Sequence, residues 1–294
     1  MNDYVIMTDS SCDLPQEVCD ELGIEVLPLS ICLDGKSYRN YLDWREIAPE
    51  VFYNALRDGK TSTTAAANID DFQKAFLRCF EAGKSVLYIG LSSAFSSNFS
   101  SAITAIALMG DRAKEFPDLR ICAVDSRSAS LALGLIVYEA AVMKKEGKSM
   151  EEVRDYAESI KLRACHWIMV SDLHFFKRGG RLSGTGAFVG SVLNIKPIVR
   201  VTTKSTLDVC AKVRGRKHAM SALIDKLQYA DDIENHVLFL GHTDCLSYAY
   251  DLREMVLKKY KPKDIIISNV GPVIGSHSGP DDLALFFLGD RDAT

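Results

Sequence analysis

Hydroxyl side chains are concentrated in residues 86–102, VLYIGLSSAFSSNFSSA. The apolar run at Val86–Leu91 predicts a buried strand, and apolar residues spaced by three and four after Asn98 predict a helix. A strand that enters a serine turn and then a helix start can receive an anion, because the first helical N–H groups lack partners and the helix dipole is positive there. The stretch therefore suggests a carboxylate or phosphate site. Helix capping explains the same serines equally well.

Two further predicted strands also end in small polar residues. Asp9-Ser10-Ser11 follows the first strand, and Asp125-Ser126 follows the strand at 119–124. Parallel α/β sheets bind ligands at the carboxyl ends of their strands. These groups should therefore converge with Ser92-Ser93, which favours a binding site over simple capping.

Composition excludes several classes of protein. The chain has 294 residues, 47% hydrophobic and 25% charged, with a net charge of −4, so a general nucleic-acid binder is not expected. We see no signal peptide and no apolar run near the roughly 20 residues that span a bilayer. The eight cysteines are scattered without a Cys-x-x-Cys pair and resemble buried, reduced thiols, which predicts a cytoplasmic protein without a disulfide frame or metal site.

The order of elements predicts an α/β protein with two domains. Strands and helices alternate through residues 1–160, which indicates a mostly parallel sheet with flanking helices. Residues 161–294 contain closely spaced strands at 198–202 and 207–213, which indicates an α/β domain with a mixed or antiparallel sheet. Locally, Asp13 is a candidate helix cap with Pro15 in the first turn. The glycine-rich stretch 271–280 is expected to be extended.

Several short motifs are similar in order and spacing to those of the DegV family over nearly the whole chain. They are Thr8-Asp9-Ser10-Ser11, Thr61-Ser62, Leu91-Ser92-Ser93, Val124-Asp125-Ser126, Gly179-Gly180-Arg181-Leu182, Leu193-Asn194-Ile195-Lys196-Pro197, Lys212-Val213-Arg214-Gly215-Arg216-Lys217 and Gly271-Pro272-Val273-Ile274-Gly275 before His277. The resemblance implies a bacterial protein that holds one long-chain fatty acid between its two domains. It further implies the binding subunit of a fatty acid kinase, which presents the carboxylate to a separate ATP-using subunit that forms the acyl phosphate. Such a subunit does no chemistry itself and needs no cofactor.

The resemblance also assigns residues by their place in these motifs. The carboxylate is expected to be held by Thr61, Ser62, Ser92, Ser93 and His277. The basic positions expected to dock the kinase subunit are Arg181 and Arg214. The chain departs from the family pattern at Thr63-Thr64, Phe95–Asn98 and Asp281-Asp282, and the last pair adds negative charge near the expected head group.

Elementary energetics fit this assignment. Two or three hydroxyl or N–H donors can hold a buried carboxylate in its ionised form. The acyl chain would supply the affinity, at roughly 0.8 kcal/mol for each buried methylene. Candidate stretches for lining the acyl tunnel are residues 131–142 and 187–195, although ordinary core is the favoured interpretation for any single residue in them.

The main alternative is an acyl hydrolase that uses Ser93 as nucleophile and His277 as base, with Asp9 or Asp125 as the third member. The chain has no Gly-x-Ser-x-Gly elbow after a strand, which disfavours this alternative. A nucleotide binder is weaker still, because both Gly-x-x-x-x-Gly-Lys-Ser/Thr and Gly-x-Gly-x-x-Gly are missing.

Overall fold

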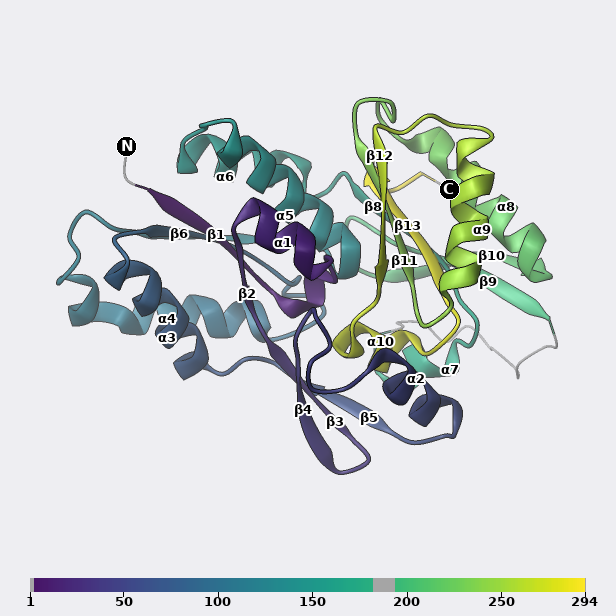
Figure 1. The fold of residues 1–294 in the computed structure, drawn as a ribbon, viewed down its shortest axis with the longest axis horizontal. Helices are drawn as coiled ribbons and strands as arrows, with labels where there is room; N and C mark the ends of the chain where they lie inside the picture. Colours follow the sequence, from purple (N-terminus) through teal and green to yellow (C-terminus); the bar gives the residue numbers. More distant parts are fainter. Residues whose placement is uncertain (1–2, 182–193, 294) are drawn as a thin grey trace.

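The computed structural model describes residues 3–181 and 194–293. A four-stranded sheet of order β2-β1-β6-β7 is parallel throughout, as the sequence predicts for the N-terminal part (Figure 1). Its strands are β1 (Tyr4–Asp9), β2 (Ile24–Leu27), β6 (Ser85–Gly90) and β7 (Ile121–Asp125). The helical elements beside it are η1 (Ser10–Cys12), α1 (Gln16–Leu22), α3 (Ile69–Glu81), α4 (Asn98–Ala113), α5 (Ser130–Lys145) and α6 (Met150–Ile160).

A six-stranded sheet of order β10-β9-β8-β13-β11-β12 forms the second half. Only the β11–β12 pair is parallel, so the sheet is mixed, in agreement with the sequence. Its strands are β8 (Ala164–Met169), β9 (Ile195–Val201), β10 (Leu207–Arg214), β11 (Val237–His242), β12 (Asp264–Asn269) and β13 (Leu283–Leu288). The helical elements of this half are α7 (His174–Arg178), α8 (Arg216–Asp225), η2 (Lys226–Tyr229), α9 (Leu246–Leu257) and α10 (Pro272–Ser278).

A small antiparallel sheet was not anticipated. It joins β3 (Leu29–Leu33), β4 (Lys36–Asn40) and β5 (Ser62–Ala65) in the order β4-β3-β5, beside α2 (Pro49–Arg57). In the sequence, residues 61–64 form a cluster of hydroxyl residues before a helix, and no strand is predicted because they show no alternation of apolar and polar side chains. Pairing with β3 makes them a strand.

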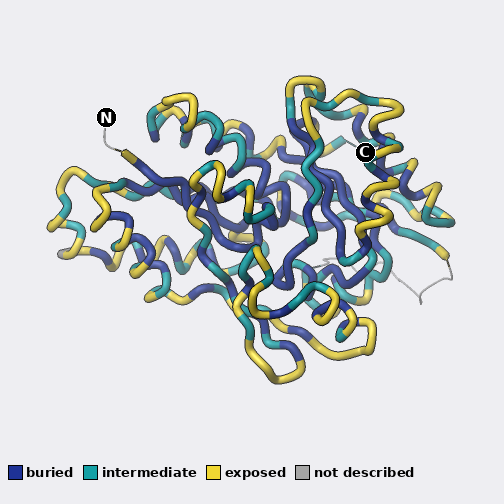
Figure 2. Tube along the Cα trace, in the orientation of Figure 1, coloured by how far each residue is buried: buried dark blue, intermediate teal, exposed yellow. Residues whose placement is uncertain are grey.

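Helix α5 lies between the two large sheets, and most of its residues are buried (Figure 2). Its leucines and valines share one core with β1 and β6 on one side and with Phe239 and Phe286 on the other. A helix that is apolar on all sides is buried on all sides. Residues 131–142, considered above as tunnel lining, therefore pack as core, while the stretch 187–193 lies outside the described residues.

Besides α5, the halves of the chain contact each other through α10, which packs on α2, β3 and β5 although it follows β12 in sequence (Figure 1). Two hydrogen bonds hold its start. The Tyr53 hydroxyl donates to the Val270 carbonyl at 2.6 Å, and the Gly271 N–H donates to Asp13 Oδ1 at 2.9 Å. Asp13 is therefore not the cap of α1, which begins after Pro15. The division of the chain at residue 160 stays a prediction.

Candidate functional site

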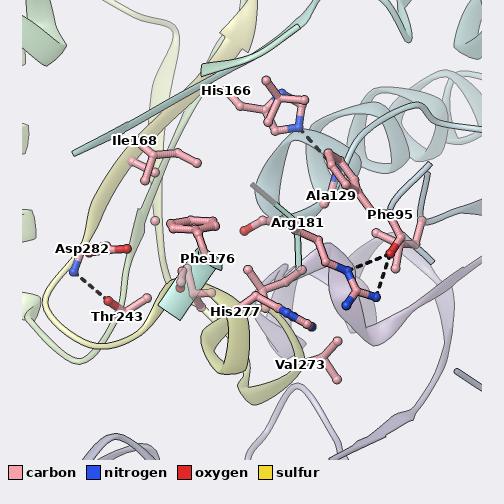
Figure 3. A pocket seen from close by; sticks show the side chains of 18 of the residues that line it. Phe95, Ala129, His166, Ile168, Phe176, Arg181, Thr243, Val273, His277 and Asp282 are labelled. Carbon is pink, nitrogen blue, oxygen red and sulfur yellow. Dashed lines mark hydrogen bonds between the residues drawn. The ribbon is translucent and has the colours of Figure 1, made fainter. Parts of the chain in front are cut away.

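A largely apolar cavity lies over the face of the six-stranded sheet that is turned toward the N-terminal half (Figure 3). Its empty space, counted together with the open mouth, is about 960 Å³. The lining residues that bear on function are Thr64, Phe95, Ser96, Ala129, Ser130, His166, Ile168, Phe176, Arg181, Thr243, His277, Asp282 and Ala284. The cavity is thus built from both halves of the chain.

His277 reaches the cavity from α10. The sequence predicts that residues 271–280 are extended, and this prediction is wrong, because residues Pro272–Ser278 form a helix. Pro272 occupies the first helical position, where its missing N–H does no harm, and Gly279 ends the helix with φ 83°. His277 Nε2 lies 3.1 Å from Thr64 Oγ1 on β5. The helix therefore joins a histidine of the C-terminal half to a hydroxyl of the N-terminal half.

The imidazole of His277 is neutral near neutral pH. Burial, and next the positive charge of Arg181, lower its pKa to about 4. Its Nδ1 is buried and has no hydrogen-bond partner among the described residues. Gly179 makes this position possible, since a Cβ at Gly179 would lie 2.2 Å from Nδ1. The first glycine of the Gly179-Gly180 motif is thus needed to leave space for the His277 ring.

Arg181 lies in the cavity wall beside His277 (Figure 3). Its Nε and Nη2 donate to the Phe95 carbonyl at 3.1 and 3.0 Å, and Nη1 donates to the Gly179 carbonyl at 2.7 Å. A guanidinium has five N–H donors, so these bonds leave capacity for a ligand. We call Thr64, Arg181 and His277 the α10 cluster. It places a positive charge, a hydroxyl and a neutral imidazole at one part of an apolar cavity.

The two arginines assigned to docking lie in different environments. Arg181 is half-buried in the cavity wall, as described above. Arg214 is exposed at the end of β10 and does not line the cavity. A docking function for either residue stays a prediction.

The hydroxyls of β5 alternate along the strand. Thr61 is exposed and precedes β5, and Thr63 is exposed as well. Ser62 is buried and lies 2.7 Å from Ser276 Oγ on α10, whereas Thr64 contacts His277. From the sequence, Thr61 and Ser62 were expected to bind the carboxylate, whereas Thr64 was not. The period of two in a strand would have placed Ser62 and Thr64 on the same face, had residues 62–65 been recognised as a strand.

In the serine turn, residues 92–97, the first two hydroxyl groups donate hydrogen bonds to other side chains of the protein. Ser92 is buried, and its Oγ donates to Ser205 Oγ at 3.3 Å. Ser93 is exposed, and its Oγ donates to Asp125 Oδ2 at 2.5 Å. Only Ser96 of this turn's serines lines the cavity. A hydrolytic triad requires the nucleophile to contact its base, whereas Ser93 bonds Asp125 and His277 bonds Thr64.

A buried aspartate organises the serine turn. Asp9 Oδ2, at the end of β1, accepts hydrogen bonds from the Leu91 N–H at 3.0 Å and from Asn98 Nδ2 at 3.0 Å. The Tyr88 hydroxyl donates to the same oxygen at 3.1 Å. Burial raises the pKa of Asp9 in spite of these bonds. In this structure it positions the turn, and it is not among the residues that line the cavity.

Among the described residues, no three His, Cys, Asp or Glu side chains are grouped so that they could hold a metal ion. No described helix has both the length and the apolar character to cross a membrane.

The two-sheet α/β fold, with an apolar cavity that has a few convergent polar groups, has the features of a small-molecule-binding protein. The chain belongs to the DegV family, whose model, described as "Uncharacterised protein, DegV family", matches residues 3–290. A DegV domain-containing protein of Clostridium perfringens is 40% identical over 291 residues, which cover 99% of each chain. One from Caldanaerobacter subterraneus is 35% identical, covering 98% of this chain and 99% of the relative.

Solved structures extend the likeness to ligand binding in relatives. A DegV family protein from Thermus thermophilus, described by its fatty acid binding, superposes with a TM-score of 0.86 at 29% identity, covering 98% of this chain and all of the other. DegV of Bacillus subtilis, described as a fatty acid binding protein, superposes with a TM-score of 0.83 at 27% identity with the same coverage. The family and fold expected from the sequence are therefore confirmed.

Proposed function

We propose that this protein binds one long-chain fatty acid in the cavity and holds its carboxylate at the α10 cluster. The observation that carries the proposal is the position of Arg181 and His277 at the wall of an otherwise largely apolar cavity. Arg181 supplies a positive charge, and Thr64 and His277 can supply neutral donors to a second oxygen. The apolar walls supply the affinity for the chain. The fatty acid binding described for the structural relatives supports the same ligand class.

Native mass spectrometry of the purified protein, with and without added palmitate or oleate, tests the ligand. One fatty acid per chain is expected. The Thr64→Val variant keeps the side-chain shape but removes the hydroxyl, and should weaken binding by about three- to tenfold. Thr63→Val, on the exposed face of β5, is the matched control and should bind like the wild type. A protein that remains empty with both acids would contradict the proposal.

We further propose that the bound carboxylate is presented to a separate fatty acid kinase subunit, with Arg214 in the contact. The exposed position of Arg214, outside the cavity, allows docking to be tested apart from ligand binding. Arg214→Ala should leave the fatty acid affinity unchanged and reduce acyl phosphate formation by a kinase subunit added with ATP. Arg253→Ala, which alters a partly exposed arginine on α9, is the control. Equal rates for both variants and the wild type would remove Arg214 from the docking surface.

In the same assay, Arg181→Ala is expected to give a different result from Arg214→Ala. Because it lines the cavity, Arg181→Ala should weaken ligand binding itself as well as phosphorylation. A loss of phosphorylation with unchanged binding would instead assign Arg181 to docking alone.

A further inference from the structure

Asp282 is a carboxyl group in the wall of the same cavity, carried by the turn before β13. The residue is 3% exposed, and its side chain extends toward Ile168 and Phe176 (Figure 3). Its backbone N–H donates to Thr243 Oγ1 at 2.7 Å, which fixes the turn. Oδ1 accepts a hydrogen bond from the Ser171 N–H at 2.6 Å. Oδ2 is buried and has no partner among the described residues.

The surroundings favour the protonated form of this carboxyl group. Burial raises its pKa well above the ordinary value, and the nearby carboxylates of Asp281 and Asp172 act in the same direction. The Ser171 N–H and the ammonium group of Lys196 oppose this rise without reversing it. Because Oδ1 already accepts from Ser171, the proton belongs on Oδ2. A protonated Oδ2 would be an O–H donor in the cavity wall without an acceptor among the described residues.

A purely hydrocarbon chain would leave this donor unsatisfied. The nearby lining side chains of Ile168, Phe176 and Ala284 are apolar and offer no acceptor. A buried donor without a partner is unfavourable, and a site built with such a group discriminates against ligands that lack the matching oxygen. Figure 3 shows Asp282 apart from Arg181 and His277, with Phe176 between them in this view. Arg181 and His277 are the groups proposed above to hold the carboxylate of the ligand.

We propose that Asp282 is a specificity residue that selects a fatty acid with a hydroxyl or keto oxygen on its acyl chain. The inference rests on the proposed function, since it assigns a second polar contact to the same ligand. The oxygen would accept the hydrogen bond of Asp282 Oδ2. The ligand would therefore be held at two polar points with hydrocarbon between them.

The test compares stearic acid with hydroxystearic acids of the same length, with the hydroxyl near the carboxyl group, in mid-chain or near the methyl end. Each is competed against stearic acid on the full chain, and bound species are counted by native mass spectrometry. One hydroxylated isomer should bind about tenfold more tightly than stearic acid. Equal binding of stearic acid and every isomer would overturn the inference and leave the proposed function standing. Failure of all the acids to bind would reject both.

Two variants test whether the Asp282 side chain causes the preference for a hydroxylated acid. Asp282→Leu should bind stearic acid at least as well as the wild type and lose the preference, whereas Asp282→Asn keeps a donor and should retain most of it. Asp251→Asn is the matched control, since Asp251 is exposed on α9 and does not line the cavity. Equal loss of all acids in a folded Asp282→Leu protein, checked by thermal melting, would place the carboxylate at Asp282 and overturn the inference. Should this variant not fold, the wild-type preference and Asp282→Asn decide the question.

Discussion

The serine turn and the α10 cluster are both rich in hydrogen-bonding groups, but all three side chains of the α10 cluster line the cavity, whereas Ser96 alone does so among the serines of the turn. In the turn, Ser92 and Ser93 are bonded to Ser205 and Asp125. In the cluster, His277 Nδ1 has no partner among the described residues, and Arg181 retains donor capacity. Donors that already have protein partners gain little from a ligand. The comparison teaches that a binding site is better recognised by cavity-lining side chains with free hydrogen-bonding capacity than by the density of hydroxyl residues in the sequence.

Each region is also held by a buried aspartate from the segment around the end of β1. Asp9 positions the serine turn, and Asp13 positions the start of α10 through the Gly271 N–H. The Ser130 hydroxyl, at the start of α5, donates to Asp13 Oδ2 at 2.6 Å. The short stretch after β1 therefore ties together three parts of the chain.

The largest effect is expected from Asp13→Asn, measured as the free energy of unfolding against pH. Burial raises the pKa of Asp13 to about 8, despite its bonds to Ser130 and Gly271. A raised folded-state pKa gives stability that is complete below the unfolded pKa of about 4 and is lost as pH rises toward 8. Asparagine keeps an acceptor for Gly271 and does not ionise.

The variant should therefore lose less stability than the wild type between pH 4 and 8, by a few kcal/mol, since each pKa unit is worth about 1.4 kcal/mol. Chemical denaturation at a series of pH values measures this difference. Parallel pH profiles for the two proteins would show that Asp13 ionises in the folded state as it does in the unfolded chain.

His277→Leu tests the comparison directly. The loss of a polar group at the proposed carboxylate site should weaken palmitate binding by about a hundredfold. Ser93→Ala should weaken it less than about threefold, because the Ser93 hydroxyl is occupied by Asp125. Titration calorimetry with both variants provides the measurement. A larger effect of Ser93→Ala would return the head group to the serine turn, as the sequence analysis expected.

Gly179→Ala should give a smaller loss of about tenfold, because the new methyl group would meet His277 Nδ1 at 2.2 Å and displace the ring. Gly180→Ala is the control. At that position no atom lies within 4 Å of a Cβ, although φ of 68° makes alanine strained there. Unchanged binding with Gly179→Ala, alongside an unchanged melting temperature, would show that the exact position of His277 is unimportant for the ligand.

The sequence by itself determined the elements with strong periodicity. The parallel strands at the N-terminus, the amphipathic helix at Ile69–Glu81 and the apolar helix at Ser130–Lys145 follow from spacing and composition. His277 was selected as a site residue through the family motifs, and the structure places it in the cavity wall. These features depend on residues close together in the chain, so local patterns carry them.

Only the tertiary structure decided which polar groups face the cavity. Thr64 contacts His277 because β5 pairs with β3 and α10 packs on both, and Asp282 is buried because β13 inserts between β8 and β11. The helical state of residues 272–278 also depends on this packing. A seven-residue helix that contains Gly275 and ends at Gly279 has little stability alone. Burial and partner choice arise from contacts between distant segments, and no local spacing encodes them.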